Sequence, residues 1–252
     1  MIPITDSVRS RSTPYVNLSI IVVNTLVFLY EVYLSNDAIR GNITELDRFI
    51  AHWGNVPVCT LAEFGRESLA VESAECAVQP NPRWTPITAM FMHGGWLHLL
   101  GNMLFLWIFG DNIEDALGHV RYLAFYLLTG IAASATHMLF NADSLTPAIG
   151  ASGAVAGVMG AYIVLFPRAI VVAFVVILIP LPVPAFVLIG FWFVMQLFYS
   201  VASLGVDANT GSGIAYLAHV GGFVAGAAII KVFMLGRVRN APARHVRGQR
   251  YG

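Results

Sequence analysis

Apolar residues in this chain gather into long runs that are separated by shorter polar segments. A helix needs about 20 mainly apolar residues to cross the ~30 Å hydrocarbon core of a bilayer. By that measure the pattern predicts six membrane spans, at about 16–34, 95–110, 121–140, 148–166, 185–204 and 214–235. The second run is short and contains polar residues. We therefore expect an all-α polytopic membrane protein, built as a bundle of six transmembrane helices.

One further apolar run, AIVVAFVVILIPLPVP at 169–184, does not fit this scheme. The uninterrupted part before Pro180 is too short to span a bilayer. Pro180, Pro182 and Pro184 would also break a helix. We interpret this segment as interfacial or re-entrant.

Positive charge predicts the orientation of the spans, because cytoplasmic loops carry an excess of Lys and Arg. Arg9 and Arg11 precede the first span, Arg168 follows the fourth, and basic residues run from Lys231 to Arg250. The loops NADSLTP and GVDANTGSG contain neither Lys nor Arg. Both termini are therefore predicted to be cytoplasmic. The organisation that follows is a cytoplasmic N-terminus at 1–15, a membrane domain at 16–235 with a long extracytoplasmic loop at 35–94, and a basic cytoplasmic tail at 236–252.

Composition supports a membrane protein and excludes some other classes. The chain is 57% hydrophobic and only 11% charged, with a mean hydropathy of +0.71, whereas soluble domains carry roughly 25% charged residues. The formal net charge of zero gives no support to a nucleic-acid partner, so the expected surroundings are a lipid bilayer. No internal repeat of the kind found in many transporters is evident. Cys59 and Cys76 could form a disulfide in an oxidising space or remain two unrelated thiols.

Three of the predicted spans carry unusual polar residues near the outer end. His98 and Asn102 lie four residues apart in the second span and so share a helical face. Ser152 begins the fourth span, and His219 lies about a turn and a half into the sixth. At 1.5 Å per residue, Ser152 and His219 both lie roughly 5–10 Å below the outer boundary. The topology therefore brings a hydroxyl, two imidazoles and an amide to a similar depth.

Small residues predict that the fourth and sixth spans pack closely. His219 shares a helical face with Gly222 and Gly226, and Ser152 shares one with Ala156. Stripes of this kind let the backbones of two membrane helices approach each other. Each of the two small faces carries one reactive residue near the same end.

These residue types suit acyl transfer. A serine hydroxyl becomes an effective nucleophile when a base takes its proton, and imidazole is the usual base near neutral pH. The oxyanion of the tetrahedral intermediate needs hydrogen-bond donors, which His98, Asn102 and the backbone N–H of Ser152 can supply. No Asp or Glu lies within the spans near this cluster, which favours a Ser152–His219 dyad over a triad with an acid.

Other interpretations of the same residues stay open. The small residues around Ser152 are ordinary packing residues in membrane helices. His98 and His219 could ligate a haem iron, although that leaves Ser152 and Asn102 unexplained. His93 and His98 do not have the spacing of a zinc motif, so no metal is expected. Gln196 in the fifth span is interpreted as forming an interhelical hydrogen bond rather than taking part in chemistry.

With these residues in place, the sequence resembles the rhomboid intramembrane serine proteases. The motifs stand as HLLGN at 98–102, GASG at 150–153 and AHVGG at 218–222, with GDNIEDALG at 110–118 at the cytoplasmic end of the second span. The resemblance covers about residues 84–230. It implies a six-span rhomboid-like bundle, and it makes the long outer loop similar to the partly embedded first loop of the family.

The resemblance implies a role for each matching residue. Ser152 would be the nucleophile and His219 the general base, while His98, Asn102 and the Ser152 N–H would form the oxyanion hole. Gly150 and Gly153 would keep the backbone close to the scissile peptide. Substrates would be other membrane proteins, cut in or near a transmembrane segment after a small residue, without metal or cofactor.

Four further expectations concern the ring of His219, the fifth span, an alternative function and the cellular location. Some members carry a tyrosine that stacks on the histidine where this chain has Ala156, so another group must orient the ring of His219. The aromatic residues at 191–193 could border a lateral substrate entrance or simply face lipid. The alternative function is a non-catalytic relative that binds unstable transmembrane helices, which the presence of both Ser152 and His219 disfavours. We expect a prokaryotic inner membrane, since the chain carries no long organelle-targeting extension.

Overall fold

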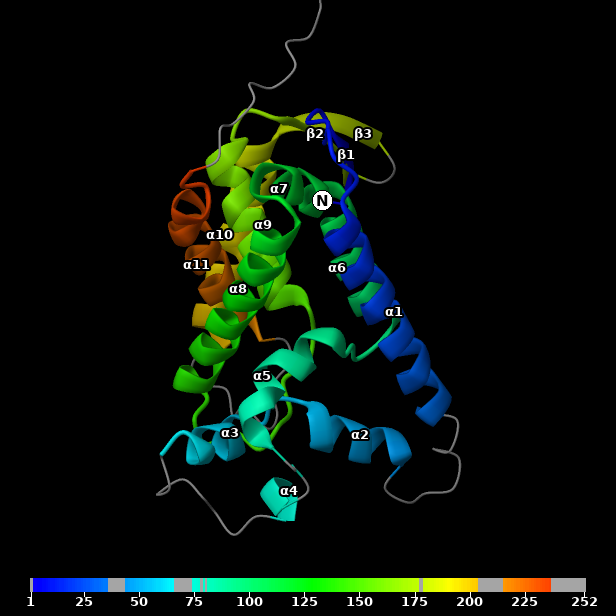
Figure 1. Cartoon of the computed structure of the whole chain (residues 1–252), viewed down its shortest axis with the longest axis vertical. Helices are drawn as coiled ribbons and strands as arrows, with labels where there is room; N and C mark the ends of the chain where they lie inside the picture. Colours follow the sequence, from blue (N-terminus) through cyan, green and yellow to red (C-terminus); the bar gives the residue numbers. More distant parts are fainter. Residues whose placement is uncertain are drawn as a thin grey trace, which may run out of the picture.

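The computed structural model describes residues 2–35, 44–65, 74–77, 79, 81–176, 179–203 and 215–236. Residues 237–252 of the predicted tail (236–252) and the loop GVDANTGSG lie outside these residues. The chain is mainly helical, with long helices running between two differently built ends (Figure 1). We call the end with the small helices of the first loop the outer end, and the end with a β-sheet the inner end. The long helices are α1 (Tyr15–Ser35), α6 (Trp96–Phe105), α8 (His119–Phe140), α9 (Ser152–Leu165), α10 (Ala185–Ser203) and α11 (Tyr216–Phe233).

Four of these helices, α1, α8, α10 and α11, are long and apolar enough to cross a membrane. The other two predicted spans are shorter. Helix α9 has 14 residues, and α6 has 10 before it continues through a π-helical turn, Leu106–Gly110, into α7 (Asp111–Leu117). The chain is thus a multi-pass membrane protein, and crossing by α6 and α9 stays a prediction.

Helix α9 lies inside the bundle, between α8 and α11. Every residue from 153 to 162 is buried. The approach to α11 is close enough that a Cβ on Gly226 would lie 2.0 Å from the carbonyl oxygen of Gly157. Toward α8, a Cβ on Gly153 would lie 2.5 Å from the Cβ of Ala133. Small residues therefore let α9 be covered by protein on two sides, as expected where helices pack backbone to backbone.

The expectation of an entirely helical chain is wrong at the inner end. Residues 169–184 are not a re-entrant segment but form a hairpin of β2 (Ile170–Val176) and β3 (Ile179–Pro184), and β1 (Ile2–Asp6) adds to β2. All neighbours in this sheet are antiparallel, in the order β1-β2-β3. The run IVVAFVV is rich in β-branched residues, which favour strands, and the prolines that follow exclude a helix.

Two aspartates lie where the sheet meets the helices. Asp6 in β1 accepts hydrogen bonds from the hydroxyl of Tyr162 in α9 and from Nδ2 of Asn112 in α7, the latter at 3.0 Å. Burial raises the pKa of Asp6 to about 6, although these donors favour its ionised form. Burial also raises the pKa of Asp111 to about 6. The sheet is thereby attached to the inner end of α9.

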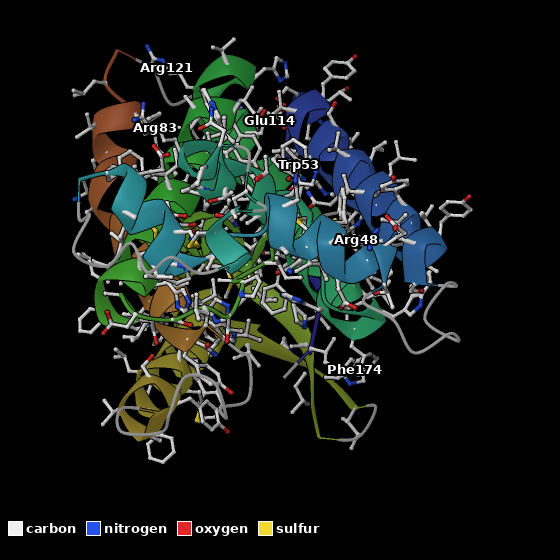
Figure 2. The ribbon with its side chains drawn as sticks, turned by 90° about the horizontal axis from the view of Figure 1, so that it is seen from below. Arg48, Trp53, Arg83, Glu114, Arg121 and Phe174 are labelled. Atoms are coloured by element: carbon white, nitrogen blue, oxygen red, sulfur yellow. A yellow bond between two sulfur atoms is a disulfide. The ribbon has the colours of Figure 1, made fainter. Side chains whose placement is uncertain are left out.

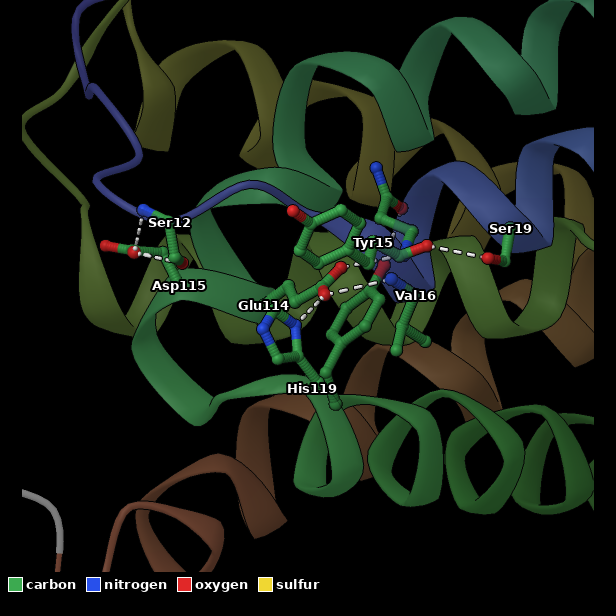
Figure 3. A network of polar contacts seen from close by, with 9 residues as sticks. Ser12, Tyr15, Val16, Ser19, Glu114, Asp115 and His119 are labelled. Atoms are coloured by element: carbon green, nitrogen blue, oxygen red, sulfur yellow. Dashed lines mark hydrogen bonds and ion pairs between the residues drawn. The ribbon is translucent and has the colours of Figure 1, made fainter.

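Glu114, the acidic residue of the GDNIEDALG motif, holds the start of α1 (Figure 3). Its carboxylate is fully buried and accepts hydrogen bonds from the backbone N–H groups of Val16 (3.0 Å) and Asn17 (2.7 Å). The first N–H groups of a helix have no partner within the helix, and a carboxylate there also complements the helix dipole. His119 Nδ1 lies 2.5 Å from the same carboxylate. Glu114 therefore has a structural role, far from the polar residues of the outer end.

The outer end is covered by α2 (Glu45–Trp53), α3 (Pro57–Glu63), α4 (Ala74–Ala77) and α5 (Thr85–Thr88). Viewed from this side, α2 and α3 lie across the bundle, with Arg48 and Trp53 on α2 (Figure 2). Cys59 and Cys76 form a disulfide between α3 and α4. A disulfide persists in an oxidising compartment, so it agrees with the predicted extracytoplasmic position of this loop.

Candidate active site

Ser152, the predicted nucleophile, is the first residue of α9. The turn before it depends on Gly150, whose φ of +134° is strained for any residue with a side chain. The backbone N–H of Gly150 donates to the carbonyl oxygen of Ala89 at 2.8 Å. Two residues earlier, Ala148 exchanges both backbone hydrogen bonds with Asn55 of the outer loop. The loop that leads to Ser152 is therefore held by backbone contacts on two sides.

His219, the predicted base, lies in the first turns of α11 and reaches Ser152. Its Nε2 is 2.7 Å from Ser152 Oγ, a distance at which a proton can pass between the two atoms. The approach depends on the close contact of the two helices, since a Cβ on Gly222 would lie 2.0 Å from the carbonyl oxygen of Gly153. The small faces predicted from sequence thus meet beside the Ser152–His219 pair.

The other ring nitrogen of His219 also has a partner. Nδ1 lies 2.7 Å from Oε1 of Gln196, a buried residue of α10. The ring of Trp192, also in α10, has its centroid 6.0 Å from that of His219. Gln196 does form an interhelical hydrogen bond, as expected, but its partner is the predicted base. Both ring nitrogens of His219 thus have hydrogen-bond partners on neighbouring helices.

The predicted oxyanion-hole residues lie on α6 beside the turn at Gly150. A Cβ on Gly150 would lie 2.8 Å from Nε2 of His98, so this ring faces the turn before Ser152. Asn102 is 7% exposed, and its Nδ2 is a buried donor without a hydrogen-bond partner. A buried donor that is left unpaired costs stability, so it marks a place where a ligand atom could bind.

A small cavity of about 40 Å³ adjoins Ser152 on the side of α8. Its polar lining includes Asn55, Ser134, His137 and Ser152. A polar cavity holds a water when it offers about 10–15 Å³ and two to four hydrogen-bonding groups. This cavity is large and polar enough for water beside the serine.

Behind His98 lies a buried pair that corrects one expectation from the sequence: Glu31, inside the first predicted span, lies near the polar cluster, where no Asp or Glu is expected. Glu31 of α1 accepts a hydrogen bond from the backbone N–H of His93 at 3.1 Å, and both residues are 3% exposed. The rings of His93 and His98 have centroids 5.1 Å apart. Among the described residues, no group of three or more His, Cys, Asp or Glu could hold a metal ion.

Comparison with known proteins gives a consistent result. The family model for the Rhomboid domain matches residues 80–236. The chain is similar to RHOMBOID-like protein 6, mitochondrial, of Arabidopsis thaliana, with 31% identity over 59% of this chain and 50% of the relative. It is also similar to the yeast Rhomboid protein 1, mitochondrial (33% identity, 56% of this chain, 39% of the relative) and to the Rhomboid protease GluP of Bacillus subtilis (35% identity, 43% and 20%). The chain spans half or less of the length of each of these relatives.

Proposed function

The chain belongs to the rhomboid family, and we propose that it is an intramembrane serine endopeptidase that cuts other membrane proteins in or near a transmembrane segment. The observation that carries this proposal is the 2.7 Å distance between Ser152 Oγ and His219 Nε2. A relative of the same family, GluP, is named as a protease. Both reactive residues are present, which disfavours a relative that only binds transmembrane helices.

The reaction follows from the chemistry of these groups. Ser152 Oγ attacks the carbonyl carbon of the scissile peptide while its proton moves to His219 Nε2. The oxyanion of the tetrahedral intermediate is stabilised by Asn102 Nδ2, His98 and the backbone N–H of Ser152. His219 then gives its proton to the leaving amine, and the C–N bond breaks to leave an acyl-serine ester.

Hydrolysis of the ester consumes one water. The cavity beside Ser152 could hold this water next to the ester, and its lining by Asn55 and His137 lies toward the outer end. His219 takes a proton from the water as it attacks, and the serine hydroxyl is then regenerated. These steps need no metal and no cofactor.

The proposed topology follows from the charges and the disulfide. Both termini lie on the cytoplasmic side, with the six-span domain at 16–235 and the disulfide-bonded loop on the opposite side. A substrate would be cut near this opposite face. Two of the relatives above are named as mitochondrial, so the comparisons do not favour the prokaryotic inner membrane that we expect from the sequence.

The test is proteolysis by the purified full chain in detergent. A single-span substrate with an Ala-containing, Gly-rich transmembrane segment would be incubated with the wild type and with Ser152→Ala and His219→Ala. We expect cleavage by the wild type alone, unaffected by EDTA. A fluorophosphonate probe, which reacts with activated serines, should label the wild type and leave Ser152→Ala unlabelled.

Two results would overturn this proposal. Cleavage that survives Ser152→Ala would remove the serine from its role. A folded wild type that neither cleaves several substrates nor reacts with the probe would favour a binding protein instead.

A further inference from the structure

Gln196 is a polar residue in an otherwise apolar stretch of α10, and the dyad described above does not use it. It is 9% exposed, while its neighbours Val194, Leu197 and Phe198 are exposed on the outside of the bundle. Polar residues inside membrane helices usually face the interior and pair with another group. Here the partner is Nδ1 of His219, at 2.7 Å.

This contact decides which nitrogen of the imidazole carries the proton. The amide oxygen of Gln196 can only accept a hydrogen bond, so Nδ1 of His219 must donate. In the neutral ring the proton is then on Nδ1, and Nε2 has a free lone pair. That lone pair lies 2.7 Å from Ser152 Oγ and can accept the hydroxyl proton. The other tautomer would place a hydrogen on Nε2 and leave the serine without a base.

We propose that Gln196 is the positioning residue of this site, forming a Ser152–His219–Gln196 relay in which a neutral amide stands where other serine proteases have a carboxylate. This proposal rests on the proposed function. The amide oxygen keeps the imidazole in the tautomer that accepts from Ser152 and stabilises the imidazolium that forms during attack. It also answers what orients the ring of His219 in a chain with Ala156 one turn after the serine.

The position inside a membrane bundle explains the choice of an amide. A carboxylate at this depth would have to be desolvated, which costs several kcal/mol, whereas an amide accepts the same hydrogen bond without a charge. The titratable groups that act on His219 are His98 and His137, and the ring of Tyr216 lies edge-on at 6.4 Å. Among the described residues, no carboxylate bonds to His219. Before the reaction starts, the Ser152–His219–Gln196 relay therefore contains no negatively charged group.

Because Gln196 lies on α10, the orientation of the His219 ring depends on the position of that helix. Ser152 and His219 lie on α9 and α11, which pack tightly, but Gln196 is carried by a helix whose outer face is exposed. Phe193 of α10 stacks on Phe223 of α11 at 4.2 Å between ring centroids and keeps the two helices together near Gln196. The orientation of His219 is thus maintained while α10 stays packed against α11.

The test compares Gln196→Met, which removes the acceptor at similar size, with Gln196→Glu and with Val194→Ala as a control at an exposed position of the same helix. For Gln196→Met we expect kcat to fall about 10- to 100-fold with KM nearly unchanged, less than the ~10⁴-fold loss when the acid of a Ser–His–Asp triad is neutralised. Val194→Ala, which leaves the contact between Gln196 and His219 in place, should keep the wild-type kcat.

The pH profile gives a readout that a merely structural role would not move. Removing the acceptor destabilises the imidazolium, so the acid side of the profile of Gln196→Met should move to lower pH. Gln196→Glu should move it to higher pH, because an ionised carboxylate stabilises the imidazolium and a protonated one donates to Nδ1 and imposes the wrong tautomer. Val194→Ala should keep the wild-type profile. A Gln196→Met enzyme with wild-type kcat and profile would overturn the proposal.

A second measurement does not depend on proteolysis. The ¹⁵N chemical shifts of the His219 side chain report the tautomer directly, and the wild type should show a protonated Nδ1 and a bare Nε2. Gln196→Met should lose this preference. A proton on Nε2 in the wild type would overturn the relay even if the enzyme cleaves its substrate, whereas an inactive wild type with the expected tautomer would contradict the protease proposal alone.

Discussion

Gly222 of α11 and Gly153 of α9 touch through their backbones: a Cβ on Gly222 would lie 2.0 Å from the carbonyl oxygen of Gly153. Gly153 directly follows Ser152, the first residue of α9, and Gly222 lies three residues after His219 in α11. The contact therefore sets the distance between the nucleophile and the base.

Gly222→Ala should separate α9 from α11. No rotamer change can relieve a clash with backbone, so we expect a loss of about 1–3 kcal/mol in the free energy of unfolding and a large loss of activity. Gly190→Ala in α10 is the matched control, since a Cβ there meets nothing within 4 Å and should be neutral or slightly stabilising. Thermal unfolding and proteolysis would be measured on both. Equal behaviour of the two variants would show that α9 and α11 can move apart freely.

Gly150→Ala should inactivate the protein with a smaller effect on stability. The new Cβ would need a φ of +134° and would lie 2.6 Å from the His98 ring, so the turn before Ser152 and the ring beside it must both shift. Strained backbone of this kind costs about 1–3 kcal/mol. Gly94→Ala, in open space before α6, should keep near-normal activity. Fluorophosphonate labelling rates of the two variants would decide the matter, and rapid labelling of Gly150→Ala would contradict the expected shift.

Asn102→Leu should reduce kcat by about 10²–10³-fold, the typical effect of removing one oxyanion donor. Because Nδ2 of Asn102 is buried without a partner, its removal should leave stability unchanged or raise it. This combination distinguishes a reaction role from a structural one. The measurements are kcat from initial rates and the midpoint of thermal unfolding. A variant that loses stability in proportion to activity would argue for a packing role.

Asp6 should contribute stability as the pH falls from about 7.5 to 5. The pKa of Asp6 is raised by burial from 3.8 to about 6, so the folded state binds a proton more readily than the unfolded chain between these two values. Stability is therefore gained as the pH falls through 6, and Asp111, with its pKa also raised to about 6, acts in the same direction. Unfolding midpoints of the wild type and Asp6→Asn across this range would test the point. Over this range the stability of the wild type relative to Asp6→Asn should rise as the pH falls, and identical slopes would contradict the role of Asp6.

Reduction of the Cys59–Cys76 disulfide should loosen the outer end. A crosslink that closes a loop of about 15 residues contributes roughly 3 kcal/mol in the chain-entropy description, and the two cysteines here are 17 apart in sequence. Helix α3, which carries Cys59, begins just after Asn55, and Asn55 pairs with Ala148 in the loop before Ser152. Loss of the disulfide should therefore also loosen the loop that positions Ser152 and lower the activity. The double variant Cys59→Ser, Cys76→Ser should match the reduced wild type and no longer respond to dithiothreitol. A response that persists in that variant would exclude the disulfide as the cause.

Much of the helical part of the fold could be predicted from sequence, because length and hydropathy are local signals. The four runs that form α1, α8, α10 and α11 were found in this way. The sheet could not be predicted in this way, because its strands β1 and β2 are far apart in the sequence. Ile2 lies opposite Phe174, and nothing in the sequence near residue 2 indicates that partner. A strand of five residues at the start of the chain carries too little pattern to be recognised alone.

The site divides in a similar way. Ser152, His219, His98 and Asn102 could be proposed from spacing and depth, since each helix fixes which face a residue occupies. The contact between Gln196 and His219 could not, because it depends on how α10 is rotated against α11. The only sequence signal was an amide in an apolar helix, which predicts a hydrogen bond but not its partner.

The proline pattern of β3 has a consequence for the inner face of the protein. Pro180, Pro182 and Pro184 alternate along the strand with Leu181 and Val183. Ala185 donates its N–H to the carbonyl oxygen of Ala169, just before β2. Because alternate residues of a strand direct their backbone groups to opposite sides, Leu181 and Val183 also point their N–H groups toward β2. The opposite side of β3 therefore has carbonyl groups but no N–H donors at these three positions. Another extended chain cannot form a regular ladder along such an edge. The proline residues therefore protect this apolar hairpin from pairing with the strands of other proteins and from starting aggregation.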